Sequence, residues 1–262
     1  MHHYQITKYD KILRGDTGVF LGPDEWTDAS EIGSLVGGKI LDLQEYLRVE
    51  NLYIDAVLRL FDASNLSYLR LCCAGLDKKD LNKLLTSKRH LHDSAFFDFD
   101  FAEDRKILRQ EIPTVIKLIL RNIAWARLEW SGKFYAHFGW DYYMYVGSHE
   151  AAENIIDEIE ASGLYAVEIP DSPYVSRNKS TNIIHIDRYM KTSEYVDEEF
   201  EIELPSEYLL PLKNIWGFSS EHPFLGNWKV DPELKDALEE IIDHKFDFDH
   251  YVYNLQTAGW SD

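Results

Sequence analysis

The sequence predicts an α+β protein in two parts: a domain of mixed helices and antiparallel strands over residues 1–170, and a small β-α-β-α-β module over residues 194–262. Apolar residues three and four positions apart predict helices, and they alternate with short strand-like segments. Closely spaced strands joined by Gly-containing turns indicate antiparallel hairpins. Residues 171–193, with four Ser, two Asn and one Pro among short apolar runs, indicate a linker between the two parts.

The size and composition are those of a globular protein. A chain of 262 residues with 45% hydrophobic side chains can bury a sizeable core. No apolar stretch reaches the length of a membrane span or a signal peptide, so we expect a cytoplasmic protein. Cys72 and Cys73 are adjacent in a predicted interior strand. We expect two free thiols of low reactivity, because neighbouring cysteines bridge only with strain and buried thiols keep a high pKa.

The first domain begins with an expected strand at residues 4–9 and a loop that ends in a helix cap at Thr27, Asp28 or Ser30. Between Leu43 and Phe61 the apolar spacing predicts a long amphipathic helix. We then expect, in chain order, a strand at 68–74, a short helix capped by Asp77, an irregular segment at 88–104 and a helix at 111–124. Strands at about 124–130, 133–138 and 141–147, a helix at 149–163 and a strand at 164–169 complete the domain.

The segment "FGWDYYMYVGS", residues 138–148, contains five aromatic side chains and raises the question of a stacking platform for nucleic-acid bases. Strand alternation places Tyr143 and Tyr145 on one face and Tyr142 and Met144 on the other. Base stacking also requires a basic groove, which the neighbouring Arg and Lys residues are too few to form. We interpret the segment as a strand that packs on both faces, and His137 as a core histidine with hydrogen-bond partners.

The module is expected to contain strands at 199–204, 227–230 and 246–255 and helices at 206–217 and 232–244. Most of the excess negative charge lies near it. Residues 1–150 contain 22 Asp and Glu against 19 Lys and Arg, whereas residues 151–262 contain 24 against 8. Such a surface repels nucleic acid and anionic membrane and attracts cationic partners. We therefore expect neither nucleic acid nor membrane as a partner.

Two groups of residues could bind a metal ion in a hydrolase. His90, His92 and Asp93 form a broken version of the metallo-β-lactamase motif, and a solvated loop is the simpler interpretation of these residues. A second group includes His244 and His250, together with Asp243, Asp247 and Asp249. No phosphate loop, nucleophile elbow or CxxC motif is present. We expect no cofactor and no enzymatic activity, with a metal-dependent hydrolase as the alternative.

Two stretches resemble known bacterial families. "YQITKYD…DEWTDASEIG…EYLRVENLYIDAVL…HFGWDYYMYVGS" resembles an uncharacterised family of cytoplasmic proteins. "EFEIELPSEYLLPLKNIWGF…FDFDHYVYNLQ" resembles a small acidic module of toxin–immunity loci. The resemblance implies an immunity protein of a polymorphic or contact-dependent toxin system, which neutralises a cationic, nuclease-type toxin by binding it stoichiometrically.

The expected binding surface lies in the acidic module. Leu234, Leu238 and Ile241 or Ile242 face the core of the predicted helix, which leaves its carboxylates outside. Trp228, on the preceding strand, is expected to act as an aromatic anchor. The complete set of candidate partner-binding residues is Trp228, Asp236, Glu239, Glu240, Asp243, Asp247 and Asp249.

Overall fold

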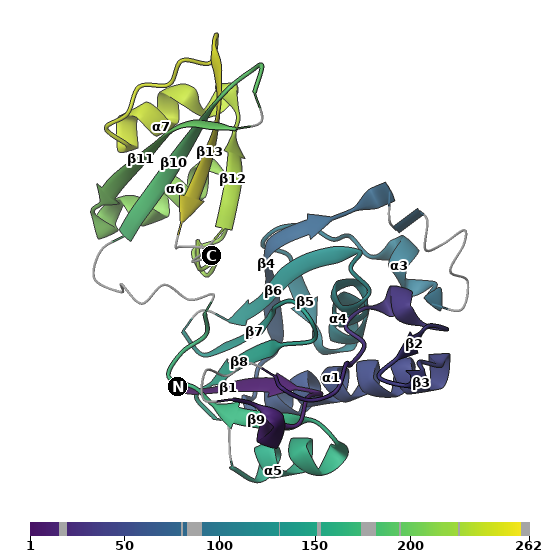
Figure 1. The fold of residues 1–262 in the computed structure, drawn as a ribbon. Coiled ribbons are helices and arrows are strands. Elements are labelled where there is room, and N and C mark those ends of the chain that lie inside the picture. The colour runs from purple at the N-terminus through teal and green to yellow at the C-terminus, as the bar shows by residue number, and fades with distance from the viewer. Residues whose placement is uncertain are drawn as a thin grey trace. The chain divides into compact units, whose positions relative to one another are not determined.

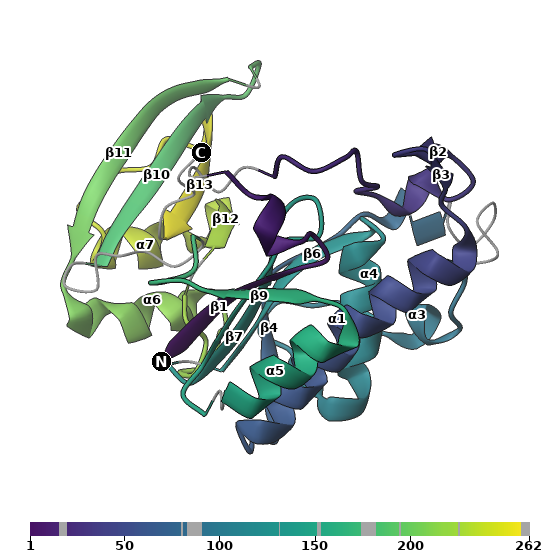
Figure 2. The same cartoon turned by 60° about the horizontal axis from the view of Figure 1, so that its bottom comes forward.

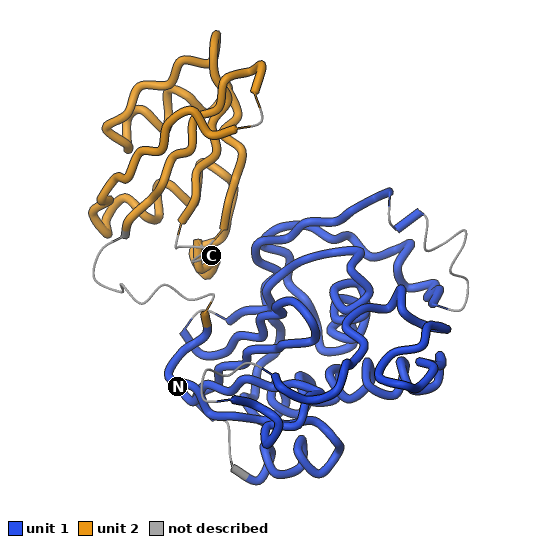
Figure 3. The backbone as a smooth tube through the Cα atoms, viewed as in Figure 1, with its two compact units in different colours: residues 1–172 blue, residues 173–262 orange. Residues whose placement is uncertain are grey.

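The computed structural model describes residues 1–15, 20–79, 81–82, 91–130, 132–150, 153–173, 182–193, 195–224 and 226–257. The chain divides into two compact units, unit 1 (Met1–Ser172) and unit 2 (Pro173–Asp262), shown in blue and orange in Figure 3. Each unit has a hydrophobic core of its own. The α+β class expected from the sequence is confirmed.

Unit 1 contains a seven-stranded antiparallel sheet in the order β5-β4-β6-β7-β8-β1-β9 (Figure 1). The strands are β1 (His2–Thr7), β4 (Tyr68–Leu76), β5 (Lys106–Leu108), β6 (Ala124–Trp130), β7 (Phe134–Phe138), β8 (Met144–Ser148) and β9 (Tyr165–Glu168). β1 lies between β8 and β9, so the first strand of unit 1 pairs with the last two strands of that unit. A separate two-stranded sheet is formed by β2 (Leu35–Val36) and β3 (Lys39–Ile40).

Helices α1 (Leu43–Ala63), α4 (Ile112–Leu120) and α5 (Glu153–Ser162) pack on one face of this sheet (Figure 2). A short helix, α3 (Ala95–Asp98), precedes β5 within the segment expected to be irregular. α1 begins where predicted because the Asp42 side chain accepts the N–H of Glu45 and caps the first turn. Its buried face includes Tyr46, Tyr53 and Leu60, each fully buried.

The aromatic segment packs on both faces of the sheet, as predicted. Met144 and Val146 lie in the core below the helices. On the other face Tyr143 packs against Tyr9, and the Tyr145 hydroxyl accepts a hydrogen bond from Gln5. Tyr142 lies in the turn before β8 rather than in the strand, and its ring packs against Trp26 and Tyr53.

Unit 2 contains a four-stranded antiparallel sheet in the order β11-β10-β13-β12, with two helices on one face (Figure 2). Its elements are β10 (Asn182–Met190), β11 (Val196–Leu204), α6 (Leu209–Ile215), β12 (Gly226–Val230), α7 (Lys235–Ile241) and β13 (Tyr251–Thr257). Leu212 from α6 and Leu238 from α7 are fully buried against the sheet residues Ile186 and Leu255.

The predicted linker over residues 171–193 is too long. Residues 182–190 form β10, which pairs with β11 on one side and β13 on the other. The error has a physical cause. Residues 171–181 are mostly polar and include three Ser, but Ile184 and Ile186 alternate with polar residues and are buried. The order along unit 2 is therefore β-β-α-β-α-β, one strand more than the module expected over residues 194–262.

Within the part of the chain that the structure describes, no helix combines the length and the apolar character needed to cross a membrane.

Candidate interaction surface

Strand β11 places carboxylates and apolar side chains on opposite faces of the unit 2 sheet. Phe200, Ile202 and Leu204 point to the core beneath the helices. Between them Glu199, Glu201 and Glu203 are exposed on the face that the helices leave open. The strict alternation of "EFEIEL" produces this separation, because successive side chains of a strand point to opposite faces.

β11 is also an edge of the sheet. It pairs with β10 from Leu204, opposite Asn182, to Val196, opposite Tyr189. Across the described residues no strand pairs with its other side. An antiparallel edge strand leaves part of its main-chain N–H and C=O groups directed outward without a ladder partner. The row of Glu199, Glu201 and Glu203 thus runs along an edge that can accept a further strand.

Most cationic contacts with β11 lie near its start. Arg188 on β10 pairs with Asp197 at 2.6 Å and with Glu198 at 2.7 Å. His185 lies 3.0 Å from Glu199 between Nδ1 and Oε1. Glu201 and Glu203 take part in no ion pair among the residues described. The negative charge is therefore least compensated toward the end of the strand.

Of the four carboxylates expected on the outer surface of α7 and just after it, three are exposed and one bonds within unit 2. Asp236, Glu240 and Asp243 are exposed, as predicted. Glu239 instead has a structural role, because its carboxylate accepts the N–H of Phe246 at 2.8 Å and contacts Lys245 Nζ at 2.8 Å. Both interactions lower the pKa of Glu239, and the hydrogen bond from Lys245 has the larger effect.

Asp247 and Asp249 do not lie on a strand face, which corrects the predicted strand at 246–255. β13 begins only at Tyr251, and the preceding residues form a turn. The Asp247 carboxylate accepts the N–H of Asp249 at 3.0 Å and contacts His250 Nδ1 at 2.8 Å. Asp side chains stabilise turns in this way by bonding the main chain two residues later.

Trp228 lies on the helix-facing side of β12 and packs within unit 2. Its ring stacks on Phe224 at a centroid distance of 4.7 Å and also contacts Trp216 and Phe218. The side chain is partly buried in the second core. Trp228 therefore packs with its neighbours in unit 2, and its expected role as an aromatic anchor stays a prediction.

Neither candidate metal group forms a cluster of metal-binding side chains among the residues that the structure describes. His90 lies outside the described residues; His92 is exposed and Asp93 accepts hydrogen bonds from Lys117 Nζ and the N–H of Ala95. His244 packs between the rings of Phe200 and Phe246, and burial lowers its pKa. Within the described chain His244 and His250 share no cluster of three metal-binding side chains with Asp243, Asp247 or Asp249.

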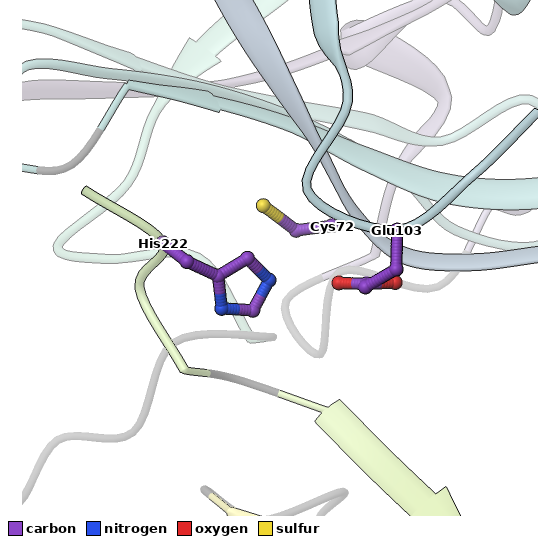
Figure 4. A group of neighbouring side chains, drawn as sticks. All are labelled: Cys72, Glu103 and His222. Carbon is purple, nitrogen blue, oxygen red and sulfur yellow. The ribbon is translucent and has the colours of Figure 1, made fainter. Parts of the chain in front are cut away.

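In unit 1 the two thiols lie at a β-bulge in β4, where the register with β6 shifts between Cys72 and Gly75. Glu103 accepts the N–H groups of Cys73 at 2.9 Å and Ala74 at 2.6 Å. Figure 4 shows the Cys72 and Glu103 side chains at this bulge. Burial raises the pKa of Cys72 well above its usual value and that of Cys73 to about 12, so neither is an activated nucleophile.

A hydrogen-bonded row in unit 1 joins three polar residues. His137 Nε2 lies 2.8 Å from Glu129 Oε1, and His137 Nδ1 lies 3.1 Å from Ser172 Oγ. Because a carboxylate oxygen accepts, Nε2 carries the proton and Nδ1 accepts from the serine. All three side chains are buried, so the row satisfies polar groups of the interior, as predicted for His137.

Sequence reasoning missed Glu199, Glu201 and Glu203 as surface candidates. The signal was present, since three carboxylates alternating with apolar residues mark an exposed strand face. Their position at an edge was not accessible from the sequence, because it depends on β10, which was assigned to the linker.

A family model for a domain of unknown function, DUF7683, matches residues 186–256, which lie within unit 2. No curated protein and no solved structure matches the chain.

Proposed function

We propose that the protein is a cytoplasmic immunity protein that binds a cationic, nuclease-type toxin in a stoichiometric complex and neutralises it. One observation carries the proposal. Residues 173–262 contain 18 Asp and Glu against 8 Lys and Arg, a formal charge of −10 in 90 residues. This charge is concentrated on a unit with its own core, which suits a module that presents one surface to a partner.

Long-range attraction explains how such a surface would act. A negative field speeds the encounter with a basic protein and repels nucleic acid, the other polyanion that a basic nuclease binds. Carboxylates can then occupy the cationic cleft in which the toxin would hold phosphates. Inhibition by occupancy needs no catalytic residue in this chain.

Affinity purification of the tagged full chain from its native cells tests the proposal. We expect a basic protein in a 1:1 complex, with an association rate that decreases steeply as salt increases. The purified partner should be toxic or nucleolytic alone and inactive in the complex. Partners that are neutral or acidic, or a basic partner that stays active when bound, would contradict the proposal.

A further inference from the structure

The side chains of β11 select against pairing with a second copy of this chain. Antiparallel pairing of two β11 strands would bring the row of Glu199, Glu201 and Glu203 close to the same row of the copy. Like charges directly opposite each other destabilise a strand pair. Charged edge strands are a recognised means of preventing such self-association.

The same row of glutamates favours pairing of β11 with a strand that carries positive charge. We infer that β11 accepts an extended basic segment of the partner as a fifth strand of the unit 2 sheet. Main-chain hydrogen bonds along the open edge would supply affinity, as in other cases of strand addition. Lys or Arg side chains at alternate positions of the segment would lie on the same face as the three glutamates.

The length and geometry of β11 suit this role. The strand has nine residues, from Val196 to Leu204, against five in β12 at the opposite edge. Its pairing with β10 keeps one register from Leu204 to Glu198 and shifts beyond Glu198. Its apolar side chains are anchored in the core through Phe200, Ile202 and Leu204, so the edge is held in an extended form before binding. A preformed edge reduces the ordering cost of association on this side.

The inference rests on the proposed function, because it takes the cationic partner from it and adds the mode of binding. It moves the contact from the carboxylates of α7 to those of β11. The two surfaces differ in kind: α7 offers charge alone, whereas β11 offers charge together with unpaired main-chain groups.

Synthetic peptides distinguish these two contributions. The probe is a nine-residue peptide with Lys and Val at alternating positions, and its control carries the same side chains with an N-methyl group on every main-chain nitrogen. Both have the same charge, but only the first can pair fully with an edge strand. We expect calorimetry with the full chain near physiological salt to give at least about tenfold weaker binding for the methylated peptide. Equal binding of both peptides overturns the inference.

A matched pair of variants locates the contact. Glu199→Lys with Glu201→Lys and Glu203→Lys should weaken binding of the unmethylated peptide at least about tenfold. Asp236→Lys with Glu240→Lys and Asp243→Lys changes the net charge equally and should have an effect of less than about threefold. Circular dichroism checks that both variants fold. The reverse order of effects overturns the inference.

The outcomes separate the two proposals. If the cationic partner binds but neither peptide does, strand addition is wrong and the proposed function stands. If the partner purified from native cells is not basic, the proposed function fails. A dimer of the wild-type chain that dissociates when β11 is charge-reversed would show that a second copy occupies the edge, and would also overturn the inference.

Discussion

Glu239 and Phe246 join the end of α7 to the turn before β13, because the Glu239 carboxylate accepts the main-chain N–H of Phe246 at 2.8 Å. The neighbouring Glu240 is exposed. Two adjacent acidic residues of one helix therefore differ in function, one holding a turn and the other facing solvent.

Glu239→Ala should lower the melting temperature of unit 2, because the variant leaves the N–H of Phe246 without its carboxylate acceptor. Glu240→Ala is the matched control and should change the melting temperature little, as expected of an exposed side chain. Thermal unfolding followed by circular dichroism gives both values. Equal melting temperatures for the two variants would contradict a structural role for Glu239.

The buried ion pair between α1 and the end of α4 should contribute strongly to the stability of unit 1. Arg121 Nε and Nη2 lie 2.7 and 2.6 Å from the two carboxylate oxygens of Glu50. Arg121→Ala leaves the Glu50 carboxylate buried without its counter-ion, so the free energy of unfolding should decrease by about 3–5 kcal/mol.

The exposed pair Glu45–Arg48, on the same helix, is the control for that measurement. Arg48→Ala should change the free energy of unfolding by less than about 1 kcal/mol, because solvent screens an exposed pair. Urea unfolding of the full chain measures both variants. A cost for Arg121→Ala no larger than that for Arg48→Ala would show that the buried pair is not formed.

His137 should make unit 1 less stable in mild acid. Burial lowers the pKa of His137, so the unfolded chain binds a proton more readily than the folded one. The stability that neutral His137 contributes is present above about pH 6.5 and is lost as the pH falls, by up to about 1.4 kcal/mol for each pH unit.

His137→Gln should reduce this pH dependence, whereas His92→Gln, at an exposed position, should retain it. Urea unfolding between pH 7.5 and 5 measures the slope for each chain. If His137→Gln keeps the full slope of the wild type, another group is responsible.

The two thiols should resist modification in the native protein. Burial raises the pKa of both, which leaves little thiolate at pH 8. Titration with a thiol reagent should detect neither Cys72 nor Cys73 until denaturant is added. Rapid labelling of Cys73 without denaturant would indicate that the β4 bulge opens readily.

The long helix and the three strands after residue 123 could be predicted because local signals determine them. Asp42 caps α1, and the turn before β7 contains Gly132 with φ of 70°, a conformation that glycine adopts without strain. Apolar spacing also placed Leu238 in the core correctly. These features depend on residues close together in the sequence.

Features that depend on distant partners were not predictable. β5 has three residues and exists because it pairs with β4. The structural roles of Asp247 and Glu239 were likewise not predictable, because their carboxylates accept main-chain N–H groups whose positions depend on the turn. Alternation in "FDFDHYV" predicts a strand, but the Asp247 carboxylate accepts the main-chain N–H of Asp249 and so stabilises a turn.

The position of β1 between β8 and β9 has a consequence for folding during synthesis. β1 is synthesised before both of its partners, which lie beyond residue 143. The apolar face of this strand, with Tyr4 and Ile6, therefore has no strand partner until most of unit 1 has been translated. Such late pairing of distant strands is slow and exposes chains to aggregation. All the strands of unit 2 lie within one short stretch of sequence, so this unit can form soon after its last strand emerges.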